Sequence, residues 1–428
     1  MRTPPTGTPR NGTVVLRRSR RDLLATGVIT ATALLGVGTV WVTSEHRAAD
    51  LTTAEQPHVA AAAPATAPAE VHEAWRSPDS AVPGQPQVQS GAGLVFTADG
   101  GTLTAVDPMT GDTVWEYRRS NHEICSVGSA FDRVYVTYRT GVGCGDVIGL
   151  DTATGEYRAA RSAIASGETV PIRSNDAVGL VSRDRVELWR NDLVRTVEYG
   201  EVEAKQEPTL QPNEDCTINS ALTRKDLLSV VEHCPPSEDR EAGYWLRMQE
   251  RAPKDSRKPV IKTQVFLGEG PARIIASGQE GAVVYRDAVD GEQPRMVGYD
   301  LDGGETGTAV VPPAPLIDSA PDLFSPVVAD LPHHLTWFDG ERLYLFTPES
   351  LVLAHHFWDA LGTGVAVGER LLYPTSEGIA VANWDTGETE RVIPVDRGGY
   401  TGQVTLSLVG GVLVEKRGDG GEVVGLVS

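Results

Sequence analysis

The sequence predicts an all-β repeat protein that follows a single membrane-spanning helix. From residue 88 onward, short runs rich in Val, Ile, Leu, Tyr and Thr alternate with Gly, Asp, Asn and Pro, which is the pattern of short strands separated by turns. One phrase recurs within these runs, and an uncharged stretch of 22 residues lies near the N-terminus. The 428 residues allow two to four domains or one large repeat architecture.

The charge of the chain is strongly uneven. The formal net charge is −20, but residues 1–50 hold seven Arg against three acidic residues. This leaves 31 basic and 55 acidic residues in 51–428, a net charge of −24. Binding to nucleic acid depends mainly on neutralisation of phosphates, so we expect no nucleic acid partner.

The N-terminal stretch from Leu23 to Ser44 is long enough to cross a membrane. As a helix it would span about 33 Å, against a hydrocarbon core of about 30 Å. Arginines precede it, so the positive-inside rule predicts a cytoplasmic basic tail (1–22), a transmembrane helix or uncleaved signal anchor (23–44) and an extracytoplasmic remainder. These topology-setting arginines are Arg17, Arg18, Arg20 and Arg21.

The residues Ser19 to Leu24, with the sequence SRRDLL, resemble a twin-arginine export signal. No clean A-x-A cleavage site follows the apolar stretch, which favours an uncleaved anchor over a cleaved signal, the alternative. Next comes an Ala/Pro-rich linker (45–70), which has little apolar bulk to bury. We expect it to be a disordered, extended and mobile tether.

The recurring phrase has the form apolar-x-apolar-Asp-x-x-Thr-Gly-x-x-x-aromatic. It is clearest at 103–117 and 147–157 and degraded at 296–305 and 379–388. An Asp at the end of a strand accepts hydrogen bonds from amides two or three residues later, and Gly supplies the positive φ that the turn requires. Each unit is too small to bury its own apolar face, so the copies must stack.

This phrase resembles the repeat of the quinoprotein-type (PQQ-like) β-propellers. The resemblance implies an all-β propeller over 71–428, with eight blades favoured and seven as the alternative. We count repeat cores at about 88–119, 124–162, 170–202, 216–266, 273–312, 333–361, 363–397 and 402–428. The last core has room for only three strands, so an N-terminal strand around Trp75 is expected to complete it, because propellers commonly close in this way.

The four cysteines recur with the repeat. Cys125 and Cys216 each begin the phrase Cys-x-x-x-Ser-Ala, and Cys144 and Cys234 follow 19 and 18 residues later. Hairpin geometry places the members of each pair within reach of each other, so we predict disulfides 125–144 and 216–234, each contributing roughly 3 kcal/mol. Reduced thiols are the alternative.

Motifs for catalysis and for cofactors do not emerge from the sequence. The pairs 333–334 and 355–356 are histidines, but neighbours on a strand point to opposite faces, which favours interface roles over a metal site. The resemblance carries over the scaffold and not a quinone cofactor or calcium site. We therefore predict no enzyme activity, cofactor or metal.

Two segments are candidates for contact with partners. One is an expanded, charged excursion in the fourth repeat, and the other is the Pro-rich stretch 312–332. The candidate contact residues of the excursion are Tyr244, Trp245, Arg251, Lys254, Arg257 and Lys258. A solvated hairpin is the alternative.

Together these observations predict a single-pass cell-membrane protein whose extracytoplasmic propeller is a non-enzymatic interaction or scaffold module for envelope proteins. The alternatives are a sensor that binds a ligand in the propeller channel, and a quinoprotein-like oxidoreductase. The sequence names no partner, ligand or pathway.

Overall fold

The structure is a computed structural model that describes residues 19–80, 82–202, 205, 207–208, 210–289, 291–320, 323–418 and 421–428. The chain divides into two units, Met1–Ala49 and Asp50–Ser428. Of the arginines expected to set the topology, Arg17 and Arg18 lie outside the described residues.

The first unit contains helix α1 (Arg20–Thr43) and the short 3-10 helix η1 (Glu45–Ala48). Ser19 caps α1 in a reciprocal arrangement, because its hydroxyl accepts from the amide of Asp22 and its own amide donates to the Asp22 carboxylate. The span Arg20–Val42 is, by length and composition, apolar enough to cross a membrane, as either an anchor or a signal sequence would be.

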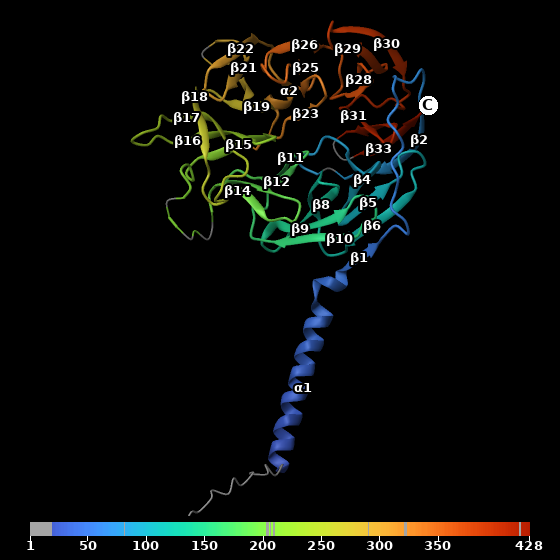
Figure 1. Ribbon diagram of the computed structural model, residues 1–428, viewed down its shortest axis with the longest axis vertical. Helices are drawn as coiled ribbons and strands as arrows, with labels where there is room; N and C mark the ends of the chain where they lie inside the picture. The colour runs from blue at the N-terminus through green and yellow to red at the C-terminus, as the bar shows by residue number, and fades with distance from the viewer. Residues whose placement is uncertain are drawn as a thin grey trace, which may run out of the picture. The chain divides into compact units, whose positions relative to one another are not determined.

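The second unit consists of eight antiparallel sheets, each a blade of a β-propeller (Figure 1). Blade 1 contains β3 (Gln89–Gly91), β4 (Leu94–Asp99), β5 (Thr102–Val106) and β6 (Thr113–Arg119), and blade 2 contains β7 (Ile124–Ala130), β8 (Arg133–Thr140), β9 (Gly143–Asp151) and β10 (Tyr157–Ser162). Blade 3 contains β11 (Val170–Ser174), β12 (Ala177–Val181), β13 (Arg185–Trp189) and β14 (Arg195–Gly200), and blade 4 contains β15 (Thr217–Arg224), β16 (Leu227–Cys234), β17 (Gly243–Glu250) and β18 (Ile261–Gly268). Blade 5 contains β19 (Ala272–Ser277), β20 (Gly281–Arg286), β21 (Arg295–Asp300) and β22 (Glu305–Val310), and blade 6 contains β23 (Val327–Asp330), β24 (Leu335–Phe338), β25 (Leu343–Phe346) and β26 (Leu353–Phe357). Blade 7 contains β27 (Val365–Val367), β28 (Arg370–Thr375), β29 (Gly378–Asn383) and β30 (Glu388–Pro394), and blade 8 contains β31 (Val404–Val409), β32 (Val412–Arg417), β33 (Glu422–Val427) and β2 (His72–Pro78). The favoured count of eight blades is confirmed.

The N-terminal strand closes the ring, as predicted. Strand β2 pairs antiparallel with β33 (Figure 1). In this register Trp75 lies opposite Gly425. Buried side chains of blades 8 and 1 then form one cluster, which includes Val414 of blade 8 and Val95 of blade 1. A further strand, β1 (Ala49–Thr52), adds to the outer edge of blade 1 beside β6. Pairing of the two chain ends removes the open sheet edges that an incomplete ring would leave.

The Pro-rich stretch differs from the expectation of a simple surface loop. It contains the short helix α2 (Pro315–Asp318) and supplies the buried side chains Ala314, Ile317 and Phe324 to the core between blades 5 and 6. Blade 6 also begins earlier than expected, at Val327, because β23 lies within the stretch assigned to the loop.

The recurring phrase joins neighbouring blades. Its aromatic residue, Trp115 in blade 1, packs over Gly155 in the corresponding turn of blade 2 and donates from Nε1 to the carbonyl of Thr152 at 3.0 Å. A side chain at Gly155 would overlap the indole, which explains the glycine. Asp151 closes the same turn by accepting from amides two and three residues later, as predicted.

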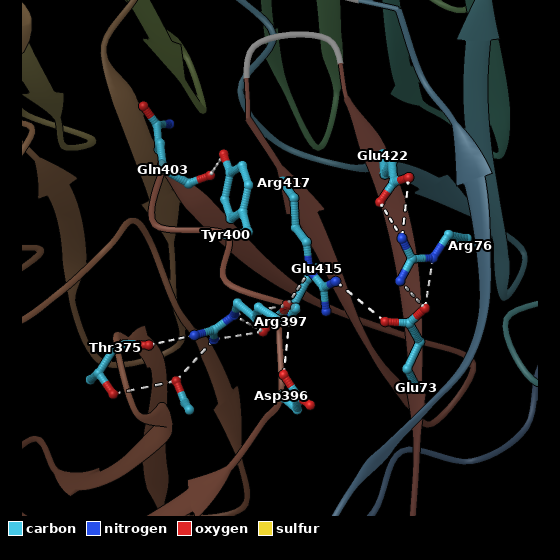
Figure 2. A network of polar contacts seen from close by, with 12 residues as sticks. Glu73, Arg76, Thr375, Asp396, Arg397, Tyr400, Gln403, Glu415, Arg417 and Glu422 are labelled. Atoms are coloured by element: carbon cyan, nitrogen blue, oxygen red, sulfur yellow. Dashed lines mark hydrogen bonds and ion pairs between the residues drawn. The ribbon is translucent and has the colours of Figure 1, made fainter.

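A buried charge network reinforces closure (Figure 2). Glu415 of β32 accepts from Arg397 at 2.7 Å and from Arg417 at 2.9 Å, and Arg417 in turn contacts Glu73 of the closing strand β2 at 3.3 Å. Arg397 also donates to the carbonyl of Gly378 in blade 7 at 2.9 Å. The network therefore links blade 7, blade 8 and the N-terminal strand.

The Ala/Pro-rich linker is extended, as expected, but residues 54–68 do not stand free as a mobile tether. This segment, the strap, follows the propeller across its seam. The amide of Ala54 donates to the carbonyl of Thr154 in blade 2 at 3.0 Å, and Arg391 in blade 7 donates to the carbonyl of Pro68 at 2.7 Å. Small alanine side chains allow this close approach, since Ala60 lies directly over Gly93 of blade 1.

Candidate partner-binding surface and central channel

The predicted aromatic residues of blade 4 lie on β17, half-buried, and each packs against a ring on a neighbouring strand. Tyr244 meets His233 of β16 at 5.0 Å between ring centroids. Trp245 meets Phe266 of β18 at 5.1 Å, and the guanidinium of Arg247 lies 4.5 Å from the Trp245 centroid. These rings form a fixed, partly exposed aromatic surface.

The predicted basic residues of blade 4 do not form one free cationic patch. Arg251 contacts Asp176 of blade 3 at 3.1 Å and so links two blades. Arg257 contacts Asp255 at 2.9 Å, and its hydrogen bonds lower the pKa of that carboxyl to about 2. Lys254 and Lys258 are exposed and have no ion pair among the described residues.

A second aromatic surface was missed by the sequence reasoning. Trp358 follows β26, and its side chain is 62% exposed. The ring is nevertheless fixed, because the guanidinium of Arg342 lies 5.3 Å from its centroid and His356 meets it edge-on at 5.1 Å. Arg342 is itself buried and contacts Asp339 at 2.7 Å. A single tryptophan beside a turn does not indicate in the sequence that its side chain will be exposed.

Both predicted disulfides form, Cys125–Cys144 and Cys216–Cys234. The second lies beside the buried Glu232, and these three residues have the proximity expected of metal ligands. Both sulfurs are committed to the disulfide, however, so they are not available as thiolates to bind a metal.

The four paired histidines separate into different contacts. His355 packs over Gly387 in blade 7, in the position that Trp115 occupies in blade 1, and its Nε2 lies 3.1 Å from the carbonyl of Asp385. His333 and His334 pack against Trp384, and His356 packs against Trp358. Burial lowers the pKa of His334.

The innermost strands surround a central channel with a cavity of about 380 Å³. A segment that we call the plug, residues 82–87, crosses it between β2 and β3. Its Gln85 side chain accepts from the amide of Val127 in blade 2 at 2.9 Å, and its Pro86 carbonyl accepts from Thr405 in blade 8 at 2.6 Å. The carbonyl of Gly84 accepts from Ser325, just before blade 6, at 3.0 Å.

The plug contacts lie mostly near the starts of the innermost strands, whereas the charged groups of the cavity come from their far ends. Arg224, the last residue of β15, binds Asp330, the last residue of β23, at 2.8 and 3.1 Å. Arg173, the penultimate residue of β11, also lines the cavity. Its side chain is solvent-exposed.

Comparison with known proteins supports the resemblance. A family model described as PQQ_2, outer membrane protein assembly factor BamB, matches residues 26–206. Among curated proteins, none matches. The crystal structure of BamB from Moraxella catarrhalis has 13% identity and a TM-score of 0.49, covering 84% of this chain and 100% of that chain. The computationally designed Ika8 protein has 12% identity and a TM-score of 0.50, covering 82% and 99%.

At 12% identity the Ika8 structure bears on the fold alone, and 548 matching chains are too many for the fold to select a function. The family model is more specific, since it spans the copies in which the recurring phrase is clearest. The predicted PQQ-like propeller resemblance is therefore confirmed, with residues 26–206 of this chain matching the family of the outer membrane protein assembly factor.

Proposed function

We propose that this chain is a membrane-anchored, extracytoplasmic β-propeller that acts as a non-enzymatic protein-interaction scaffold in the cell envelope. The observation that carries the proposal is Trp358, which is 62% exposed yet held in place by Arg342 and His356. Tryptophan is prominent among residues that dominate binding energies at protein interfaces. A ring fixed before binding loses less conformational entropy when a partner covers it.

The matched family supports the same kind of role, because its description names a protein assembly factor. Closure of the ring by β2 suits this role, since it makes one rigid platform from eight small sheets. The aromatic surface at Trp245 and Phe266 supplies a second candidate contact, with Lys254 and Lys258 as exposed charges nearby in sequence. The partner that fits such surfaces is a protein with apolar anchor residues.

The proposed membrane anchor and the proposed extracytoplasmic location of the propeller rest on two further observations. Helix α1 has the length and composition of a membrane span. The two disulfides suit an oxidising compartment outside the cytoplasm. With Arg20 and Arg21 at its start, the positive-inside rule orients the helix with its N-terminus in the cytoplasm.

Photo-crosslinking in intact cells tests the proposal. A photoreactive phenylalanine analogue replaces Trp358 or Trp245, and the matched control replaces Met109, which is also exposed and apolar, at 54%. We expect one envelope protein to be captured at 358 or 245 and not at 109. Capture should then fall in a Trp358→Ala variant of the 245 probe if both surfaces serve one partner. Equal capture at all three positions, or capture of cytoplasmic proteins, would contradict the proposal.

A further inference from the structure

We propose that the turns beneath the strap form a binding site for an extended, Ala/Pro-rich segment of a partner protein, and that the strap occupies this site in the free protein. We call the site the track. It consists of the turns at 92–93, 153–154, 368–369 and 410–411 together with Arg391. The proposal is independent of the scaffold role, which concerns the exposed aromatic surfaces at Trp358 and Trp245.

The first step is that the propeller is shaped to receive the strap. Gly93, Gly411 and Gly368 lie between the first two strands of blades 1, 8 and 7, and all three have positive φ. A Cβ atom at any of them would lie less than 3.0 Å from an atom of the strap. The corresponding turns of blades 2 to 6, all of them described, contain no glycine with positive φ. The glycines therefore match the path of the strap.

The second step is that the track recognises backbone groups. At one end the carbonyl of Thr154 accepts from the amide of Ala54 at 3.0 Å. At the other end Arg391 donates to the carbonyls of Ala67 at 3.3 Å and Pro68 at 2.7 Å. Between these ends, small residues and backbone of the strap cover the glycines. Such contacts fit an extended segment of small residues, and proline favours the extended conformation before binding.

The third step is that the strap is held weakly. Residues 59–63 are all exposed, and Val59 is 84% exposed, so this stretch buries little apolar surface. A segment with few buried contacts has low local stability. The strap can open without opening the ring, because β2 and not the strap completes blade 8.

The fourth step concerns the source of a competing segment. The strap lies between β1 and β2, and both strands pair with their own propeller. The strap of a second copy is thus tied at both ends and cannot reach a neighbouring track unless these strands unpair. An extended segment of a partner protein has no such restraint, so we assign the site to a partner.

The test is a fluorescence anisotropy titration of the full chain in zwitterionic nanodiscs with a labelled synthetic peptide of residues 53–69. The strap competes at high effective concentration, so binding to the wild type should be weak. Ala54→Pro/His58→Pro removes two strap amides that donate to carbonyls of blade 2 and leaves the track intact. This variant should bind the peptide roughly ten-fold or more tightly than the wild type does.

Hydrogen exchange measures the opening of the strap separately. The remaining amides of residues 54–68 should exchange faster in Ala54→Pro/His58→Pro than in the wild type, because the strap has lost two hydrogen bonds. Unchanged exchange would show that these bonds do not hold the strap, and would overturn the third step.

Two glycine variants in the Ala54→Pro/His58→Pro background locate the bound peptide. Gly93→Ala places a methyl group where Ala60 of the peptide should lie, so binding should weaken at least ten-fold. Gly100→Ala is the matched control, since Gly100 also has positive φ but open space around it, and binding should not change. No peptide binding, equal binding to the wild type, or equal effects of the two glycine variants would each overturn the proposal.

Discussion

Substitution of Glu415 is the most demanding test of how this ring closes, because its buried carboxylate joins the groups at the seam. Its side chain has no exposed surface, and it accepts hydrogen bonds from Arg397 and Arg417, which are each 4% exposed. Glu415→Gln keeps the size and one acceptor oxygen but removes the carboxylate charge, the one that pairs with both guanidinium groups among the described residues. Arg417 retains a contact with Glu73, whose side chain is 26% exposed.

The expected cost follows from this geometry. Removal of one partner from a buried ion pair typically costs 3–5 kcal/mol, because the other charge stays buried without compensation. Glu73 still faces Arg417, and Arg397 keeps its bond to the carbonyl of Gly378. We therefore expect a loss near the lower end, about 3 kcal/mol in the free energy of unfolding.

Urea denaturation of the full chain is the appropriate assay, since guanidinium is a salt and would screen the charges under study. The matched control is Arg370→Ala, which removes an exposed ion pair with Glu390 within blade 7 and should change stability little. Proteolysis within residues 70–80 should accelerate in Glu415→Gln and not in the control, because β2 is held by the network. A Glu415→Gln variant as stable as the control would refute the reasoning.

Further predictions follow from the turns and the strap. Gly93→Ala and Gly100→Ala both place a side chain at positive φ, but only the first would meet the strap, so elastase should cut the strap faster in Gly93→Ala alone. Burial raises the pKa of Asp151, but hydrogen bonds, chiefly from Arg158, outweigh this and leave the pKa lowered. The stabilisation from Asp151 is thus present above its unfolded pKa of 3.8 and lost as pH falls through its folded pKa, so the stability difference between wild type and Asp151→Asn should shrink in acid unfolding curves. Trp115→Ala should lower the free energy of unfolding in urea by about 3–5 kcal/mol, because the indole is buried between blades; a loss below 1 kcal/mol would show that the contact is dispensable.

Repetition made most of the fold predictable. The phrase at 103–117 contains an acid and a glycine at set spacings, and both have the same task in the copy at 147–157. Asp107 and Asp151 each accept from an amide two residues later, and Gly111 and Gly155 lie against Trp75 and Trp115. The three-strand last repeat implied a missing strand, and β2 fills it. The disulfides were predictable for the same reason, since their cysteines recur with the strands.

The strap, the plug and the channel charge could not be predicted in this way. The strap binds mainly through backbone groups and small side chains, as at Ala54 and Ala60, so its Ala/Pro composition looks like that of a free tether. The plug holds residues from blades far apart in sequence, among them Val127 and Thr405. An arginine on a strand such as Arg173 gives no sign that it faces a channel. These features depend on long-range packing, which no local pattern records.

The central claim is that the N-terminal strand closes an eight-bladed ring outside the cytoplasm. Ser77 lies opposite Val423 across β2 and β33, where paired Cα atoms are close enough for a disulfide bond. We therefore predict that Ser77→Cys/Val423→Cys, made in the full chain and isolated from the cell envelope, forms a 77–423 disulfide detectable by mass spectrometry. Free thiols at 77 and 423 beside intact 125–144 and 216–234 disulfides would contradict closure, and loss of the native disulfides would contradict the compartment.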